Sequence, residues 1–386
     1  MKKICGLPEA VSALKKQFLI VLALGIASVS CSQSPKEKVD LTHQLKQLTN
    51  EYLALNEEAS GAMLRVHQPG KLDLGYSVGF KGIQKKERLS GKEPFIAASI
   101  TKTFIAVCLL KLVEEGRLHL EDKVIKYIDG SIIEKLTKYE GKSYEHQLTI
   151  EHLLRHRSGI HDYLNKGQVH LDGYKERPHK NYSLEDRLDI ALSNGTAVNK
   201  INTYFYSNTN YILLGMIIEK IEKRAIDEVV KTRICDPLGL DNTTLNPSST
   251  VVQTMWRGYY TDWDLTSFTL EFNKGNPAGG ILTTADDLIK FGQGLFNGIL
   301  FQDRDSLKLM LDFQKGYGLG LMLFDKSRKT GKIVGHSGFD PGYTCYLIHL
   351  ETPNITLVTA INQSELKVKM PAFLPVKAVA AIKKAM

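Results

Sequence analysis

Strand-like stretches stand near both ends of this 386-residue chain, and a helical, loop-rich region separates them. Near the N-terminus, residues 61–66 and 72–80 flank the turn signal Gln68-Pro69-Gly70. Toward the C-terminus, strand-like runs occupy residues 317–324, 333–335, 343–350 and 355–361. The economical fold is one sheet built from both ends of the chain, with a helical insertion over about residues 120–270.

Helical spacing of apolar residues predicts the segments that surround this sheet. The expected helices cover a first stretch from Leu41 to Leu53 and then residues 104–113, 148–154, 184–193, 211–221, 285–295 and 378–386. Residues 104–113 are apolar almost all round, which is typical of a helix buried on most sides. Ser99 then lies near the start of a core helix.

Ser99 and Lys102 are three residues apart, so a helix would point both side chains to one face. A serine hydroxyl needs a base beside it, and lysine can be that base where apolar surroundings disfavour its charged form. The helix N-terminus adds free N–H groups where an oxyanion would develop. The Ser-x-x-Lys pattern is weak by itself, because Ser12 to Lys15 and Ser364 to Lys367 also match it.

Two later motifs support Ser99. Of two Tyr-x-Asn triplets, Tyr206-Ser207-Asn208 leads directly into an apolar helix, whereas Tyr163-Leu164-Asn165 lies in what reads as a mobile loop. For a third motif, Lys329-Thr330-Gly331 falls in a charged stretch typical of an exposed hairpin turn. His336-Ser337-Gly338 instead stands at a predicted strand edge among glycines that permit close backbone approach, and we prefer it.

The order Ser99-x-x-Lys102, Tyr206-Ser207-Asn208, His336-Ser337-Gly338 resembles the penicillin-recognising serine hydrolases. These include class C β-lactamases, D-alanyl-D-alanine carboxypeptidases and related esterases. Accessory stretches at residues 153–160, 236–240 and 277–281 agree, and the similarity spans about residues 45–365. The resemblance implies an α+β fold, in which an antiparallel sheet flanked by helices and a helical lobe enclose the site.

The resemblance also implies a role for each motif residue. Ser99 would be the acylated nucleophile, and Lys102 and Tyr206 would share the general-base work. The backbone N–H groups of Ser99 and Phe339 would form the oxyanion hole. The substrate-binding residues would be Asn208, His336, Ser337, Gly338 and Phe339. No metal and no organic cofactor is expected.

The third motif departs from many β-lactamases, which place a lysine where this chain has His336. Histidine is cationic only in part near neutral pH, so selection of a substrate carboxylate is weaker. We therefore expect a D-alanyl-D-alanine carboxypeptidase-like enzyme or a D-amino-acid peptide hydrolase that acts on small peptide or ester substrates, with peptidoglycan stem peptides first. A β-lactamase or esterase of the same superfamily is the alternative.

The first thirty residues read as an export signal, because lysines precede an apolar run over residues 18–29. That run is shorter than the roughly 20 residues that span a bilayer. Residues 28–31 resemble a lipoprotein signal, and an ordinary signal peptide is the alternative. We expect a signal peptide over 1–30, lipidation at Cys31, a tether over 31–44, a hydrolase domain over 45–386, and a membrane-anchored location in the bacterial cell envelope.

Other classes of function find less support. Gly335-His336-Ser337-Gly338-Phe339 fails the nucleophile-elbow pattern at its last position, and Gly316-Tyr317-Gly318-Leu319-Gly320 reads as a bend instead of a nucleotide loop. The net charge of +8 comes without an arginine-rich stripe, so no nucleic-acid partner is expected. The histidines at positions 152, 156, 161, 170 and 179 lack a metal-ligand pattern. A non-catalytic lipoprotein that binds peptidoglycan fragments remains open.

Overall fold

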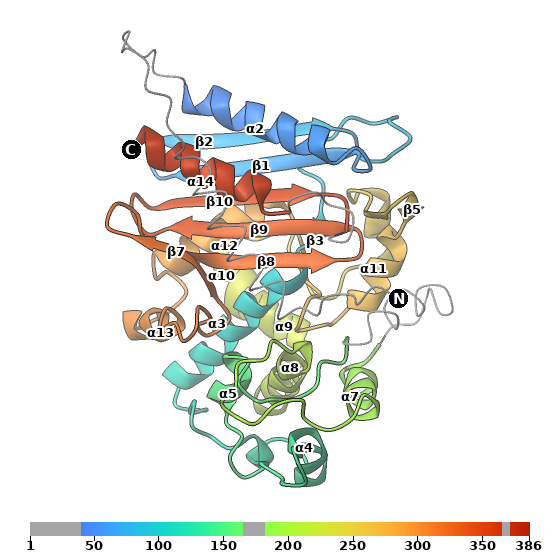
Figure 1. Ribbon diagram of the computed structural model, residues 1–386, viewed down its shortest axis with the longest axis vertical. Helices are drawn as coiled ribbons and strands as arrows, with labels where there is room; N and C mark the ends of the chain where they lie inside the picture. The colour runs from blue at the N-terminus through green and yellow to red at the C-terminus, as the bar shows by residue number, and fades with distance from the viewer. Residues whose placement is uncertain (1–39, 165–181, 365–370) are drawn as a thin grey trace.

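The computed structural model describes residues 40–164, 182–364 and 371–386, and its centre is one antiparallel sheet of six strands (Figure 1). In spatial order the strands are β2 (Leu72–Gly79), β1 (Gly61–Gln68), β10 (Ile355–Ile361), β9 (Tyr343–Leu350), β8 (Gly331–Asp340) and β7 (Met322–Ser327). The two chain ends meet in the middle, where Ala62 of β1 pairs with Ile361 of β10. The predicted α+β fold, with one sheet built from both ends, is confirmed.

Helices cover both faces of this sheet. On one face, α2 (Leu41–Leu55) and α14 (Phe373–Ala385) lie side by side, and Leu45 and Val379 share an apolar cluster with strand residues (Figure 1). On the other face lies α12 (Ala285–Phe296), which packs against α3 (Thr101–Glu114). The rings of Phe104 and Phe291 stack there with their centroids 3.6 Å apart. Helix α3 is therefore a core helix, as its all-round apolar pattern predicts.

The helical lobe extends beyond the β7–β8 side of the sheet (Figure 1). Its elements are η2 (Val124–Lys126), α4 (Gly130–Thr137), α5 (Ile150–Leu154), α7 (Leu184–Ser193), α8 (Asn208–Glu222), α9 (Ile226–Val230), η3 (Lys231–Cys235) and α10 (Asp236–Leu238). Smaller elements connect lobe and sheet: β3 (Phe95–Ile96), η1 (Ala98–Ile100), η4 (Ser249–Gln253), β4 (Tyr259–Tyr260), β5 (Trp263–Asp264), α11 (Thr266–Asn273), β6 (Leu282–Thr283) and α13 (Arg304–Met310).

Several predicted boundaries need correction. The strand expected over residues 317–324 begins only at Met322, because Gly318 and Gly320 form a bend packed closely against neighbouring backbone. Strand β8 runs past the predicted 333–335 to Asp340, so His336 lies inside a strand. Helix α2 begins at Leu41, so the predicted tether over 31–44 overlaps it by four residues. Residues 1–39, with the predicted signal and Cys31, lie outside the described ranges.

Two further observations concern the described residues alone. Within residues 40–164, 182–364 and 371–386, every helix falls short of the length and apolarity that a bilayer-spanning segment requires. Cys108, Cys235 and Cys345 are buried free thiols, and burial raises the pKa of Cys108 and Cys235 to about 12. They act as small core residues here.

Candidate active site

The candidate nucleophile lies on a tight turn between β3 and α3. Ala98, just before Ser99, adopts a positive φ of 48°, a conformation that costs energy for any residue with a Cβ. The segment at Ile281 holds this turn from both sides. The Ala97 N–H donates to the Ile281 carbonyl at 2.8 Å, and the Ile281 N–H donates to the Thr101 hydroxyl at 3.0 Å. The accessory stretch 277–281 therefore fixes the position of Ser99.

Lys102 is fully buried, and its amine has three oxygen neighbours among the described residues. The Nζ atom lies 3.0 Å from Ser99 Oγ, 2.7 Å from Asn208 Oδ1 and 2.6 Å from the Ala278 carbonyl oxygen. Burial lowers the pKa of Lys102 to about 7. A neutral amine has two hydrogens and one lone pair. Because the two carbonyl oxygens can only accept, they take both hydrogens, and the lone pair faces the Ser99 hydroxyl.

The second motif brings Tyr206 and Asn208 to the same amine. The Tyr206 ring lies with its centroid 5.0 Å from Lys102 Nζ, and burial raises its pKa well above the usual value. Its phenol therefore stays protonated, so it can hold or give a proton but is a poor base by itself. Asn208 Nδ2 donates to Asp162 Oδ2 at 2.9 Å. That bond turns the Asn208 oxygen toward Lys102 and fixes it there.

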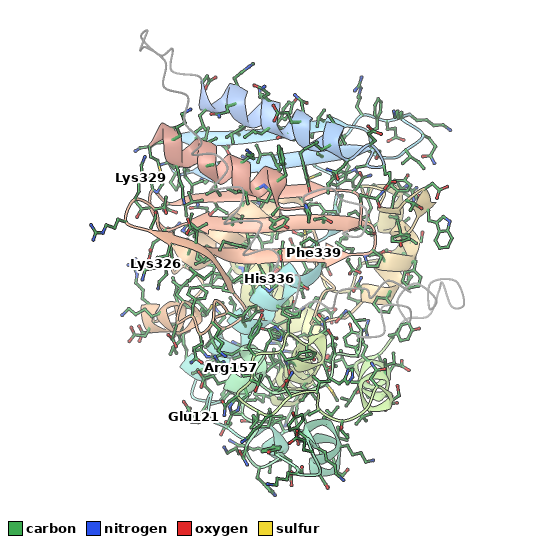
Figure 2. The ribbon with its side chains drawn as sticks, in the orientation of Figure 1. Glu121, Arg157, Lys326, Lys329, His336 and Phe339 are labelled. Carbon is green, nitrogen blue, oxygen red and sulfur yellow. The ribbon has the colours of Figure 1, made fainter. Side chains whose placement is uncertain are left out.

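The third motif lies on an open edge of β8. Strand β7 pairs with β8 only as far as Gly335, so from His336 onward this edge faces the turn that carries Ser99. An added Cβ at Gly338 would lie within 3 Å of the Ala97 carbonyl oxygen and of Cys345 Sγ. Gly338 therefore permits the nucleophile turn to pack directly on the sheet. Figure 2 shows His336 and Phe339 along this strand beside α3.

Strand alternation separates the side chains of the third motif. The Ser337 hydroxyl donates to Met322 Sδ at 3.6 Å, and Phe339 packs edge-on against Tyr346 with the apolar cluster under α2 and α14. Because these two side chains pack elsewhere, Ser337 and Phe339 offer only their backbone groups to the site. His336 is fully buried on the other side, and both of its ring nitrogens have partners inside the protein.

The competing motifs lie elsewhere. Lys329 stands at the outer β7–β8 turn, far from His336, and its Nζ donates to the Lys383 carbonyl at 2.6 Å (Figure 2). Tyr163 is buried and its hydroxyl accepts from Asn276 Nδ2 at 3.2 Å, while the rest of the loop predicted to be mobile lies outside the described residues. The Ser364 hydroxyl donates to the Tyr259 carbonyl at 3.2 Å. Asn165, Lys367 and the Ser12–Lys15 pair lie outside the described residues.

The histidines of the lobe have structural partners. His152 caps α5 with Thr149 and approaches Asn202 Oδ1 at 2.8 Å, and His156 lies between Tyr206 and Tyr317. His161 Nδ1 lies 3.3 Å from the Asp162 carbonyl oxygen. In the part of the chain that the structure describes, no three His, Cys, Asp or Glu side chains gather as a metal site would require. The positions 170 and 179 fall outside it.

Sequence reasoning missed three groups around the site. Asp162 orients Asn208, the Ala278 carbonyl binds Lys102, and Tyr317 contacts His336. The stretch 277–281 gives a signal through its resemblance. The sequence predicts the Gly316–Gly320 segment as a bend and also a strand from Tyr317 onward, and the structure has the bend. Asp162 gave no local signal, because its partner is 46 residues away.

Comparisons with known proteins agree with this geometry. The model of the family described as Beta-lactamase matches residues 45–377. The chain is 28% identical over 339 residues to "Penicillin-binding protein 4*" of Bacillus subtilis (strain 168), covering 82% of this chain and 70% of that protein. It is 29% identical to "Protein flp" of Staphylococcus aureus (strain MW2), covering 49% of this chain but only 35% of that protein.

Solved structures show the same fold. A D-amino acid amidase from Ochrobactrum anthropi SV3, in complex with D-phenylalanine, has a TM-score of 0.73 and 25% identity, covering 89% of this chain and 99% of that one. An octameric penicillin-binding protein homologue from Pyrococcus abyssi has a TM-score of 0.73 and 24% identity, covering 88% of this chain and 77% of that one. The chain belongs to the beta-lactamase family and is a serine hydrolase of the superfamily that also contains the penicillin-binding proteins.

Proposed function

We propose that this protein hydrolyses amide or ester bonds adjoining a D-amino acid through an acyl-enzyme on Ser99. One observation carries the proposal: the buried Lys102 amine lies 3.0 Å from Ser99 Oγ while two carbonyl oxygens take its hydrogens. A lysine with a pKa of about 7 is neutral in about half of the molecules at pH 7, so its lone pair can accept the serine proton.

In the acylation step, Ser99 Oγ forms a bond to the substrate carbonyl carbon and gives its proton to Lys102. The negative charge moves to the carbonyl oxygen, and in this proposal the N–H groups of Ser99 and Phe339 stabilise it. Tyr206 supplies a proton to the leaving amine or alcohol as the scissile bond breaks, and Lys102 reprotonates the phenol. Water then attacks the ester on Ser99, and the acid product leaves as the hydroxyl regains its proton.

The third motif favours substrates that need no carboxylate. Burial and the charge of Lys102 lower the pKa of His336 to about 3, so the imidazole is neutral where many relatives carry a lysine. A buried neutral ring offers no fixed charge to a substrate carboxylate. Among the activities that the sequence leaves open, this supports D-amino-acid amide, ester or peptide hydrolysis over a dedicated β-lactamase. The enzyme from Ochrobactrum anthropi SV3 with a similar fold is named a D-amino acid amidase.

A substrate panel tests the proposal. Purified protein and the Ser99→Ala variant are assayed on D-alanine amide, L-alanine amide, a peptide ending in D-alanyl-D-alanine, and benzylpenicillin. We expect Ser99-dependent turnover of the D-amide and little of the L-amide. Faster loss of benzylpenicillin than of every amide would identify a β-lactamase instead. Turnover that survives in the variant would contradict the role of Ser99, and binding without turnover would favour the non-catalytic alternative.

We also propose that the protein is exported and anchored to a membrane through lipid on Cys31. The support is the sequence alone: a lysine-flanked apolar run, the lipoprotein-like residues 28–31, and the polar stretch over residues 32–38. A lipid anchor and a polar tether would place the hydrolase domain at the surface of the envelope, where peptidoglycan peptides are present.

A further inference from the structure

Tyr317 joins two buried histidines that come from separate parts of the fold. Its hydroxyl lies 3.0 Å from Nε2 of His336 in β8 and 3.3 Å from Nε2 of His156, which follows α5. Tyr317 is 1% exposed and both histidines are 0% exposed. Because such groups cannot rely on bulk solvent, each polar atom has to be satisfied within the protein. The hydrogen positions can therefore be assigned from the partners.

His156 is fixed as a donor toward Tyr317. Its Nδ1 faces two donors, the Ser207 N–H at 3.2 Å and Asn210 Nδ2 at 3.1 Å. The orientation of Asn210 is set independently, because its Oδ1 accepts from the Ser158 hydroxyl at 2.6 Å. Nδ1 of His156 is thus the bare nitrogen and Nε2 carries the hydrogen. That hydrogen points to the Tyr317 oxygen.

His336 is fixed in the opposite tautomer. Its Nδ1 lies 2.7 Å from the Ser337 carbonyl oxygen, which can only accept, so Nδ1 carries the hydrogen. Nε2 is then bare and accepts the Tyr317 hydroxyl hydrogen. Hydrogen bonds run in one direction, from His156 through Tyr317 and His336 to the Ser337 carbonyl. Both N–H and lone pair of the His336 ring are used, and neither is left for a substrate.

Protonation of His336 would break this chain. A hydrogen on Nε2 would face the Tyr317 hydroxyl, which would have to stop donating there, accept from both histidines and turn its hydrogen to the neighbouring Tyr211 hydroxyl. Among the described residues, Tyr206 and Lys102 also give a cation on this ring no support: the Tyr206 ring centroid lies 6.5 Å away and its phenol stays protonated, and the charge of Lys102 disfavours a second cation. The neutral form is therefore held by contacts as well as by burial.

We propose that Tyr317 is a positioning residue that makes the enzyme select against substrates bearing a carboxylate at the third motif. Its hydroxyl holds His336 in the neutral Nδ1–H tautomer, and the motif presents no cation. A substrate carboxylate would lose water there without gaining a charged partner, whereas an uncharged amide or ester end loses little. The inference rests on the proposed function, since it concerns the same Ser99 site.

The direct test is nitrogen-15 NMR of the wild-type protein labelled at histidine, with the His336 signals assigned by their loss in His336→Asn. We expect an Nδ1–H, bare-Nε2 pattern that does not titrate between about pH 5 and 8, where an unperturbed histidine would. The reverse tautomer, or titration in that range, would overturn the proposal. This readout needs no turnover, so it stands or falls separately from the proposed function.

The functional test is Tyr317→Phe, which removes only the hydroxyl. We expect His336 to begin titrating, and the ratio of kcat/KM for benzylpenicillin to that for D-alanine methyl ester to rise about tenfold below pH 7, roughly what one lost hydrogen bond is worth. The gain should vanish in Tyr317→Phe with His336→Asn. If Tyr317→Phe lowers kcat/KM for both substrates equally and His336 still does not titrate, the hydroxyl has only a structural role.

Tyr204 supplies the matched control. Its ring centroid lies 6.1 Å from that of Tyr317, and within the described residues its buried hydroxyl has no hydrogen-bond partner. Tyr204→Phe removes the same atom from the same aromatic cluster, so we expect neither His336 titration nor a changed substrate ratio. A Tyr204→Phe variant that matched Tyr317→Phe would show a general packing effect and would contradict the specific role of the Tyr317 hydroxyl.

Discussion

At the scale of single residues, the site depends on one desolvated amine. Lys102 is buried, and among the described residues no carboxylate contacts it: its partners there are a hydroxyl and two carbonyl oxygens. Asp162 and Asp340 act on it from further away and raise its pKa, but burial is the larger effect and the pKa falls to about 7. The balance leaves a lysine that is neutral often enough to serve as a base.

The activity should therefore depend on pH through Lys102. The neutral amine is the active form, so kcat/KM for a D-amino acid ester should rise about tenfold per pH unit below 7 and level off above it, following the pKa of about 7. Initial rates between about pH 5 and 9, corrected for ester hydrolysis without enzyme, measure this. A profile that is flat or falls over that range would show that Lys102 is not the base.

Removal of either distant carboxylate should move that profile. Asp162→Asn keeps an oxygen for Asn208 but removes the charge that most favours protonated Lys102, so the midpoint should shift to lower pH. Asp340→Asn should shift the midpoint in the same direction but by less, because Asp340 raises the pKa of Lys102 less than Asp162 does. Comparison of the pH profiles of the two variants shows which substitution shifts the midpoint further. Midpoints that stay in place or move upward in both variants would contradict this account of the electrostatics.

Residue-level prediction from sequence worked where the chemistry is local. Ser99 and Lys102 are three residues apart on one helical path, so their meeting followed from spacing. Tyr317 and Asp162 could not be found this way, because their partners His336 and Asn208 are 19 and 46 residues distant. The role of His336 was read from its residue type, and only its partners show that both ring nitrogens are already engaged.

At the scale of elements, the central contact is between the η1 turn and the open edge of β8. Gly338 permits it, because any Cβ there would press on the Ala97 carbonyl oxygen and on Cys345 Sγ. The contact sets the distance between the Ser99 N–H and the Phe339 N–H, which together are proposed to hold the oxyanion. A small shift of either element would misplace one of these donors.

Gly338→Ala should therefore damage activity more than stability. We expect kcat/KM to fall about 10²-fold or more, the typical loss when one oxyanion donor is misplaced, with the melting temperature lowered by only a few degrees. Gly130→Ala is the control, since an added Cβ at Gly130 meets nothing within 4 Å. A Gly338→Ala variant with wild-type kcat/KM would show that the close packing on Ala97 does not position the site.

Elements bounded by clear turn signals were predicted to the residue, and others were not. Strands β9 and β10 and helix α7 coincide with their predicted ranges, because each is a continuous pattern that ends at polar or turn-forming residues. The apolar run from Tyr317 to Leu321 looks like a strand but is a bend, since Gly318 and Gly320 pack against Met310 and Ala106. Tertiary packing determines the conformation of that segment.

At the scale of the whole molecule, pairing of β1 with β10 joins the two ends of the chain in one sheet, and residues from all three motifs meet beside it. The α+β class, the sheet built from both ends and the helical lobe were all predictable, because the long apolar patterns and the family resemblance agree. The packing of the lobe on the sheet was not, since it depends on contacts such as those of His156, Tyr206 and Tyr317.

The proposed anchor makes a prediction for the intact chain. In a bacterial host, the full-length protein should incorporate a fatty-acid label and sediment with membranes, whereas Cys31→Ala should lose the label and be released from the membrane fraction. Cys5→Ala, in the proposed signal peptide, is the control and should still be labelled. Equal labelling of the Cys31→Ala protein would rule out lipidation at that residue and favour an ordinary signal peptide.

The central claim is that Ser99 forms a covalent acyl-enzyme, and intact-protein mass spectrometry tests it most directly. The protein and its Ser99→Ala variant are mixed with a D-amino acid p-nitrophenyl ester and quenched in acid within milliseconds to seconds. The intact mass of each protein is then measured. We predict an added acyl mass on the wild-type protein alone, mapped to the peptide that contains Ser99. An adduct of equal yield on Ser99→Ala, or turnover with no adduct at any quench time, would contradict the account.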